Sequence, residues 1–176
     1  MPGSQLSRRV VLGYHHEGEC AGLLCRLGLP YRFNQPCGEI PLCPYDSCRL
    51  LAINLYAYVE HPFTPEARFD FELFRQHVQA AQRIMDDIID LELEKIDDIQ
   101  RKIGIDPESD EVKQTERHLW EKIQKTTSMG RRTGVGITAE GDMLAALGLC
   151  YGTQEATDFA VEVQKTLALN AYRMSA

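Results

Sequence analysis

The sequence predicts an α/β chain in which helices predominate, because two regions of contrasting pattern follow one another. Residues 33–65 contain five prolines, which exclude a long helix there and favour loops and strands. From residue 70 to about residue 99, apolar residues recur at intervals of three and four, as on the buried face of a helix. The 176 residues suffice for one buried core, and residues 1–33, which show no sustained period, form an unassigned N-terminal segment.

The first element with a clear pattern is the apolar stretch of residues 49–59. Its leucine, isoleucine and tyrosine side chains are consistent with a buried strand that continues into a short helix. Periodicity alone does not separate a strand from a helix over so short a run, so both remain open for this stretch.

A long helix is expected next, with Asp70 as its N-cap. Its apolar stripe is predicted to consist of Phe74, Val78, Ala81, Met85 and Ile88. Such a stripe buries one face of the helix against the rest of the chain.

Three further helices and one extended segment follow. Gly104 and Pro107 interrupt the first helix, and Thr138 and Thr153 are suitable caps for the last two helices. The expected extents are Pro107 or Asp110 to Thr127 for a helix, Thr133 to Ile137 for the extended segment, Thr138 to Gly148 for a helix, and Thr153 to Met174 for the last helix.

Charge is distributed unevenly along the chain. Residues 86–111 carry eleven acidic and three basic residues, a local charge of −8, which leaves +1 for the rest of a chain with net charge −7. We interpret the acidic run as a solvated helix face. Arg131 and Arg132 form a basic pair, which is too small for a nucleic-acid-binding surface.

Targeting signals are also missing from the sequence. No apolar run reaches the ~18 residues of a membrane-spanning helix. No apolar segment follows the two arginines near the N-terminus, as it would in a secretory signal. The sequence therefore predicts a cytoplasmic protein with neither a membrane nor a nucleic-acid partner.

Five of the six cysteines lie within 29 residues, which in a cytoplasmic chain favours metal binding or catalysis over structural disulfides. Cys20 and Cys25 are separated by four residues, as are Cys43 and Cys48, and a tetrahedral zinc site can use such pairs. A zinc-binding interaction module built from these four thiols is therefore one candidate function. The alternative interpretation is that Cys20, Cys25 and Cys150 are unrelated buried thiols.

The stretch Gln35-Pro36-Cys37-Gly38-Glu39 combines three chemically useful groups. In an extended chain, Gln35, Cys37 and Glu39 share one face, while the proline stiffens the approach and the glycine admits a close ligand. A thiol, a carboxylate and an amide supply a nucleophile or radical carrier, a proton acceptor and a hydrogen-bond donor. From the residues alone, a tight turn with a buried cysteine explains the same pattern.

Two stretches resemble one enzyme family. Pro36-Cys37-Gly38-Glu39, followed by Ser47-Cys48 and the apolar residues 50–55, resembles the finger loop of ribonucleotide reductase large chains, in the form typical of the adenosylcobalamin-dependent, class II enzymes. Residues 131–152, with Arg131-Arg132 followed by Gly134 and Gly136, are similar to a second stretch of that family in the same order. The resemblance covers residues 34–176 and implies the C-terminal-half segment of a ribonucleotide reductase-like α/β barrel, with two short strands around the finger loop.

The resemblance also implies a reaction, the reduction of ribonucleotides to 2′-deoxyribonucleotides, with adenosylcobalamin as radical source and a thioredoxin-type reductant. Cys37 matches the thiyl-radical cysteine that abstracts the 3′ hydrogen, and Glu39 matches the carboxylate that accepts the 3′-hydroxyl proton. Cys48 matches one of two reducing cysteines that end the turnover as a disulfide. Gln35, with Asn34 before it, stands where the family has asparagine, so either amide is a candidate. The substrate-binding residues that the resemblance implies are Gln35, Pro36, Cys37, Gly38 and Glu39.

The family's pattern includes parts that these 176 residues lack. They are the upstream strand with the partner of Cys48, a phosphate-binding loop, the remaining barrel strands and the C-terminal relay cysteines. We therefore expect the isolated chain not to complete the reaction, and to need the missing barrel half or a second copy of itself. Besides the zinc module, a catalytically inert remnant that associates through an exposed apolar patch is a third possibility.

Overall fold

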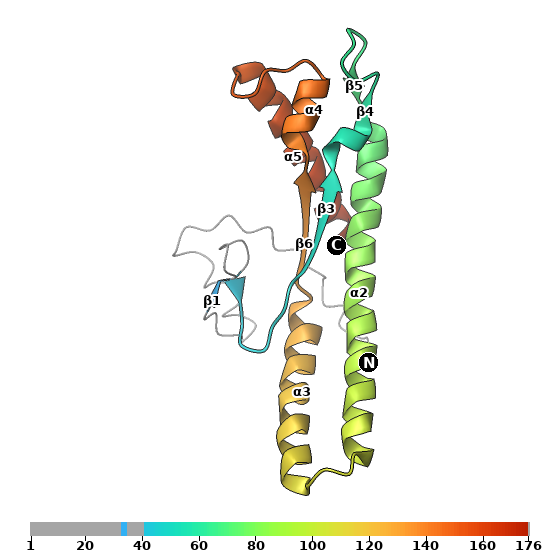
Figure 1. Cartoon of the computed structure of the whole chain (residues 1–176), viewed down its shortest axis with the longest axis vertical. Coiled ribbons are helices and arrows are strands. Elements are labelled where there is room, and N and C mark those ends of the chain that lie inside the picture. The colour runs from blue at the N-terminus through green and yellow to red at the C-terminus, as the bar shows by residue number, and fades with distance from the viewer. Residues whose placement is uncertain (1–32, 35–40, 176) are drawn as a thin grey trace, which may run out of the picture. The chain divides into compact units, whose positions relative to one another are not determined.

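The computed structural model describes residues 33–34 and 41–175, which form two compact units. The first unit contains residues 50–85 and 133–175, and the second contains residues 33–34, 41–49 and 86–132. Helices predominate, as predicted. The α-helices are α2 (Phe71–Ile105), α3 (Asp110–Gly130), α4 (Glu140–Ala146) and α5 (Gln154–Ser175) (Figure 1).

Each sheet within the described residues has two strands. The antiparallel pairs are β1 (Phe33–Asn34) with β2 (Pro41–Leu42) and β4 (Val59–Glu60) with β5 (Arg68–Phe69). The third pair is β3 (Arg49–Asn54) with β6 (Thr133–Thr138), whose arrows run in the same direction (Figure 1). The helical α/β content and the two strands around residues 35–40 are confirmed. The described residues contain no closed barrel.

The core of the first unit is a single apolar cluster to which β3, β6, α2, α4 and α5 all contribute. Residues 49–54 form the predicted strand, which continues into the short 3₁₀ helix η1 (Leu55–Tyr58). The prediction that the strand is buried is wrong for most of its length, since Ile53 is its one fully buried residue. The ring of Tyr58 packs against Phe69 and Phe74, with ring centroids 5.8 and 5.1 Å apart. These ring contacts join η1 to β5 and to the first turn of α2.

Helix α2 begins where the sequence predicted, because Asp70 Oδ1 accepts a hydrogen bond from the backbone N–H of Leu73 at 2.9 Å. Four of the five predicted stripe residues, Phe74, Val78, Ala81 and Met85, are buried. The prediction for Ile88 is wrong, since its side chain is 39% exposed and Ile89 is buried instead. From Ile89 onward the buried positions Ile96 and Ile103 repeat every seven residues, the period of two helices that pack side by side.

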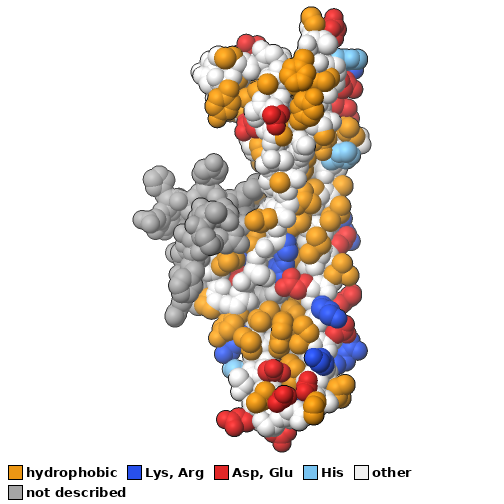
Figure 2. Space-filling model, in the orientation of Figure 1, with side chains coloured by type: hydrophobic (Ala, Val, Ile, Leu, Met, Phe, Trp, Pro, Cys, Tyr) orange, Lys and Arg blue, Asp and Glu red, His pale blue; other side chains and the backbone are white. Residues whose placement is uncertain are grey.

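In the second unit, the later part of α2 packs antiparallel to α3. Gln100 Nε2 donates to Gln124 Oε1 at 3.1 Å, and Gln124 Nε2 donates in turn to Asp97. Acidic side chains gather where α2 is joined to α3 (Figure 2), and Glu108, Asp110 and Glu111 are exposed there, as a solvated acidic face requires.

Two of the predicted helix starts have different outcomes. Thr153 caps α5 as expected, because its hydroxyl accepts a hydrogen bond from the N–H of Ala156 at 3.3 Å. Thr138 does not cap α4: it is the last residue of β6, and Ala139 occupies the N-cap position in the left-handed conformation without a side-chain cap. None of the helices within the described ranges is both long and apolar enough to span a membrane.

Candidate functional site

Strands β1 and β2 frame the segment that carries the predicted radical cysteine. Asn34 pairs with Pro41, and Phe33 pairs with Leu42, so the residues on either side of 35–40 lie side by side. Gln35, Pro36, Cys37, Gly38 and Glu39 lie outside the described residues, and their roles stay predictions. Cys48 is the predicted site residue whose surroundings the structure describes.

The segment before Cys48 begins with a tight turn. The N–H of Asp46 donates to the carbonyl of Cys43 at 3.1 Å, and Tyr45 between them has a positive φ of 66°. The ammonium group of Lys122, from α3, lies 5.1 Å from the centroid of the Tyr45 ring, a cation–π distance. The turn reverses the chain after β2 and directs it toward β3.

A buried ion pair holds this turn. Arg132 Nε, just after α3, donates to Asp46 Oδ2, and the two side chains are only 5% and 0% exposed. Arg132 Nη2 also donates to Cys43 Sγ at 3.4 Å. Burial raises the pKa of the Cys43 thiol above its usual value, although the Arg132 guanidinium opposes this effect. Cys43 is therefore a protonated, inert thiol at neutral pH.

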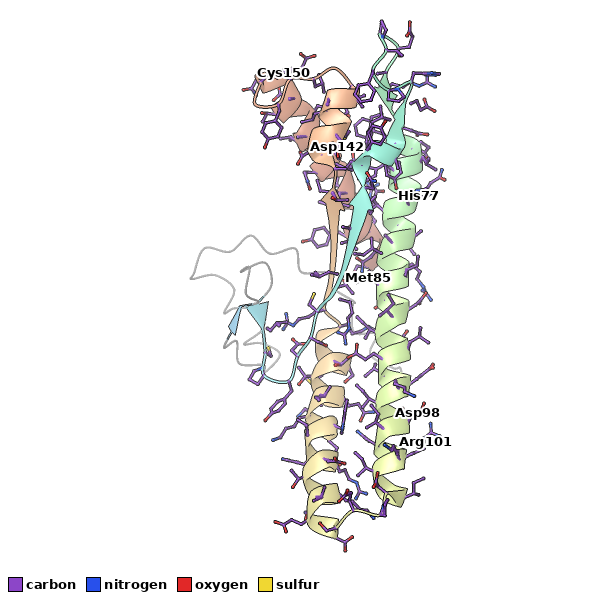
Figure 3. All side chains as sticks on the ribbon, in the orientation of Figure 1. His77, Met85, Asp98, Arg101, Asp142 and Cys150 are labelled. Atoms are coloured by element: carbon purple, nitrogen blue, oxygen red, sulfur yellow. The ribbon has the colours of Figure 1, made fainter. Side chains whose placement is uncertain are left out.

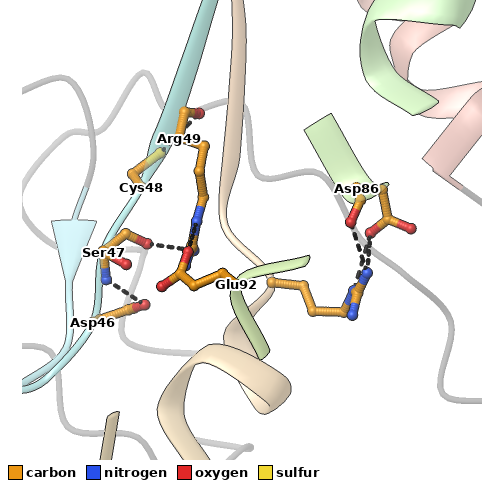
Figure 4. Close-up of polar contacts among 7 residues, drawn as sticks. Asp46, Ser47, Cys48, Arg49, Asp86 and Glu92 are labelled. Atoms are coloured by element: carbon orange, nitrogen blue, oxygen red, sulfur yellow. Dashed lines mark hydrogen bonds and ion pairs between the residues drawn. The ribbon is translucent and has the colours of Figure 1, made fainter. Parts of the chain in front are cut away.

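Charged contacts continue on both sides of Cys48 (Figure 4). Asp46 Oδ1 accepts from the N–H of Ser47 at 2.9 Å, and the Ser47 carbonyl accepts from Arg49 Nη1 at 3.1 Å. Arg49 Nε donates to Glu92 Oε2 at 2.7 Å, and Nη2 bonds the same oxygen. Cys48 is half-buried, with Sγ 3.6 Å from the Arg49 carbonyl. These contacts join the Cys48 segment to α2.

Arg131, the first residue of the second sequence motif, forms a separate cluster with α2. Its guanidinium donates to Asp86 Oδ1 at 2.7 Å and to Asp90 Oδ1 at 2.7 Å, and it also bonds the Asp86 carbonyl. Burial alone would lower the pKa of Arg131, but its hydrogen bonds to Asp90 and Asp86 outweigh burial and raise it. The interpretation of the whole acidic run as solvated is wrong at Asp86, whose side chain is 13% exposed and ion-paired.

The cysteine predictions can be compared in part with the structure. Within residues 33–34 and 41–175, no three His, Cys, Asp or Glu side chains gather as a metal site would require. Cys20 and Cys25 lie outside those ranges, so the four-thiol zinc module is untested. The prediction for Cys150 is wrong: it lies in the connection between α4 and α5 and is exposed (Figure 3).

A cavity of about 360 Å³ lies where β3 and β6 end. It is lined by Asn54, Tyr56, Phe63, Ala139, Asp142 and Ala145. The carboxyl ends of parallel strands are frequent ligand sites, and this volume is near the lower limit for a small-molecule pocket.

Sequence reasoning found Cys48 but missed the residues that surround it. Asp46, Arg49 and Glu92 belong to no local motif, and Glu92 lies 43 positions from Arg49. Arg132 stood out only as part of a basic pair and of the second motif. In the sequence these residues are visible only as isolated charges beside apolar residues, and this pattern does not show which charge pairs with which.

Comparison with known proteins points to the same family as the two motifs. The family described as "Ribonucleotide reductase, barrel domain" matches residues 32–176. A vitamin B12-dependent ribonucleoside-diphosphate reductase of Thermoplasma acidophilum is 31% identical over 140 residues, which are 80% of this chain and 15% of the relative. Proteins of the same name from two strains of Mycobacterium tuberculosis are 26% identical over 140 residues, 80% of this chain and 16% of each relative.

No solved structure matches the chain. The chain spans less than a fifth of the length of these curated relatives. The family match over residues 32–176 includes both the Cys37 and Cys48 stretch and the Arg131-Arg132 stretch. The chain therefore belongs to the ribonucleotide reductase family, by its match to the barrel domain.

Proposed function

We propose that residues 34–176 supply the finger loop and one reducing thiol of a cytoplasmic, vitamin B12-dependent ribonucleotide reductase, as a segment of its α/β barrel. The observation that carries the proposal is the family match over residues 32–176, which includes Cys37, Glu39 and Cys48. The fixed surroundings of Cys48 support it, because a thiol that takes part in a reaction has to be held in place.

In this proposal each residue of the finger loop has its own role in the reaction at the ribose. A thiyl radical at Cys37 takes the 3′ hydrogen atom and later returns it, while Glu39 accepts the proton of the 3′-hydroxyl group. Gln35 or Asn34 donates an amide hydrogen bond to the substrate, and Pro36 and Gly38 shape the loop around it.

Two thiols supply the electrons that reduce the ribonucleotide. The 2′-hydroxyl group leaves as water, and Cys48 and a second thiol outside this chain supply two electrons and two protons and form a disulfide. A thioredoxin-type dithiol reduces that disulfide, so the sum is one ribonucleotide and one dithiol converted to one deoxyribonucleotide, one disulfide and one water.

The cofactor that the family names imply is a cobalamin. The cavity of about 360 Å³ at the ends of β3 and β6 is far too small for a corrin ring with its nucleotide and adenosyl groups. The described residues thus do not fit adenosylcobalamin by themselves. We assign its binding to the assembled reductase, together with the missing barrel half or a second copy of the chain, and to no residue described here.

Anaerobic turnover tests the proposal. The chain alone, given a ribonucleotide, adenosylcobalamin and a dithiol, should form no deoxyribonucleotide. A chimera in which residues 34–176 replace the matching segment of the Thermoplasma acidophilum relative should form it. Activity of the chimera should disappear in Cys37→Ser and Glu39→Gln and should persist in the matched control Cys150→Ser. A folded chimera that is equally active with Cys37→Ser would disprove the proposed role of the loop.

A further inference from the structure

The charged contacts beside Cys48 fix the backbone on both sides of this residue. Both carboxylate oxygens of Asp46 are used: Oδ2 by the buried Arg132, and Oδ1 by the N–H of Ser47. Because Arg132 lies two residues after the end of α3, the position of Ser47 is tied to the end of that helix and does not depend on the loop alone.

The other side of Cys48 is tied to α2. Arg49 divides its guanidinium between Glu92 of that helix and the carbonyl of Ser47. Ser47 is thus held at its N–H by Asp46 and at its C=O by Arg49. The Sγ of Cys48, the next residue, lies 3.6 Å from the Arg49 carbonyl oxygen.

Apolar packing anchors this stretch only in part. No apolar residue from position 44 to position 52 is fully buried: Leu50 is 62% exposed, and Leu51 packs against the apolar cluster of the first unit but is only partly buried. A segment without fully buried apolar side chains opens locally at low cost unless polar contacts hold it. Here the contacts are charge-assisted, which are the stronger kind of hydrogen bond.

We propose that Asp46 and Arg49 are positioning residues that hold the Cys48 thiol in register for its redox step. The inference rests on the proposed function of Cys48 and adds to it the side chains through which the protein controls that thiol. A thiol that has to reach both a substrate and a partner thiol loses much of its rate when it is misplaced by ~1 Å.

Alkylation of the reduced full chain tests the proposal without any need for turnover. Iodoacetamide labelling, followed by mass spectrometry of the peptides, gives the rate at Cys48 relative to the exposed Cys150 of the other unit. Asp46→Asn and Arg49→Gln should each raise this ratio at least about tenfold, because each variant loses at least one charge-assisted hydrogen bond. Arg49→Lys, which keeps a cationic donor, should restore most of the protection.

Two internal controls complete the experiment. Arg101→Gln removes an exposed ion pair with Asp98 on α2 (Figure 3) and should leave the ratio unchanged. The buried Cys43 reports folding and should stay protected in Arg49→Gln. A ratio within about twofold of wild type in Arg49→Gln overturns the proposal. So does equal labelling of Cys43 and Cys48 in that variant, because the contacts would then serve only the stability of the unit.

The failure of this inference is distinguishable from failure of the proposed function. In the active chimera, Arg49→Gln should lower kcat and leave KM unchanged, since Arg49 positions a thiol and does not bind the nucleotide. If Cys48→Ser leaves deoxyribonucleotide formation intact over many turnovers, the proposed function of Cys48 is wrong, whatever the alkylation ratio shows.

Discussion

Arg132 and Asp46 form an ion pair that joins positions 86 residues apart and is almost completely shielded from solvent. Arg132 belongs to the second sequence motif, and Asp46 lies two residues before Cys48. The pair therefore links the two stretches by which the family was recognised. Removal of one member of such a pair leaves the other charge buried and uncompensated, which costs more than the pair contributes.

Asp46→Ala should lower the free energy of unfolding by about 3–5 kcal/mol, because Arg132 would remain buried without its carboxylate. Urea denaturation followed by circular dichroism measures the loss. Asp98→Ala is the matched control: Asp98 is half-exposed in its pair with Arg101, and its removal should cost less than about 1 kcal/mol. Equal losses in the two variants would contradict the buried character of the Asp46 pair.

The Cys43 thiol should make the free energy of unfolding of the second unit depend on pH in the alkaline range. Burial raises the pKa of this thiol above its usual 9.0. The folded state then holds the proton more tightly than the unfolded state, so the contribution is complete below pH 9 and is lost as the pH rises through the folded pKa.

The free energy of unfolding should accordingly fall more steeply above about pH 9 in the wild type than in Cys43→Ala. Denaturation curves at about pH 7 and about pH 10 measure the difference. Parallel falls in the two proteins would show that Cys43 does not carry this dependence. Tyr58, whose pKa burial also raises, contributes equally to both proteins and cancels in the comparison.

The sequence predicted α2 well and the contacts of the site poorly, for one physical reason. A helix start such as Asp70 and a stripe such as Phe74 to Met85 follow from neighbours three or four positions away. The pairs of Arg49 with Glu92 and of Arg132 with Asp46 form only when distant segments meet. No local pattern encodes them, so the motif identified Cys48 and not the residues that hold it.

Ile88 and Ile89 show the same limit within one helix. The spacing predicts Ile88 as the next residue of the stripe, whereas the folded chain buries Ile89 and leaves Ile88 39% exposed. Ile89→Ala should therefore lower the free energy of unfolding by about 2–5 kcal/mol, as the truncation of a fully buried isoleucine does. Ile88→Ala should cost less than about 1 kcal/mol, because this side chain is partly in solvent. If urea denaturation showed a larger loss for Ile88→Ala than for Ile89→Ala, the predicted stripe through Ile88 would be correct.

The Arg131 cluster allows a graded prediction. Asp86 receives two hydrogen bonds from the guanidinium on one carboxylate oxygen and is 13% exposed, whereas Asp90 receives one and is 49% exposed. Asp86→Asn should therefore cost about 1–3 kcal/mol in the free energy of unfolding, and Asp90→Asn less than about 1 kcal/mol. Arg131→Gln loses both carboxylate contacts and should be at least as destabilising as Asp86→Asn.

Arg117→Gln, on the exposed face of α3, is the control for loss of an arginine and should leave the urea midpoint unchanged. If Asp90→Asn cost as much as Asp86→Asn, burial would not be what gives the Asp86 contact its strength.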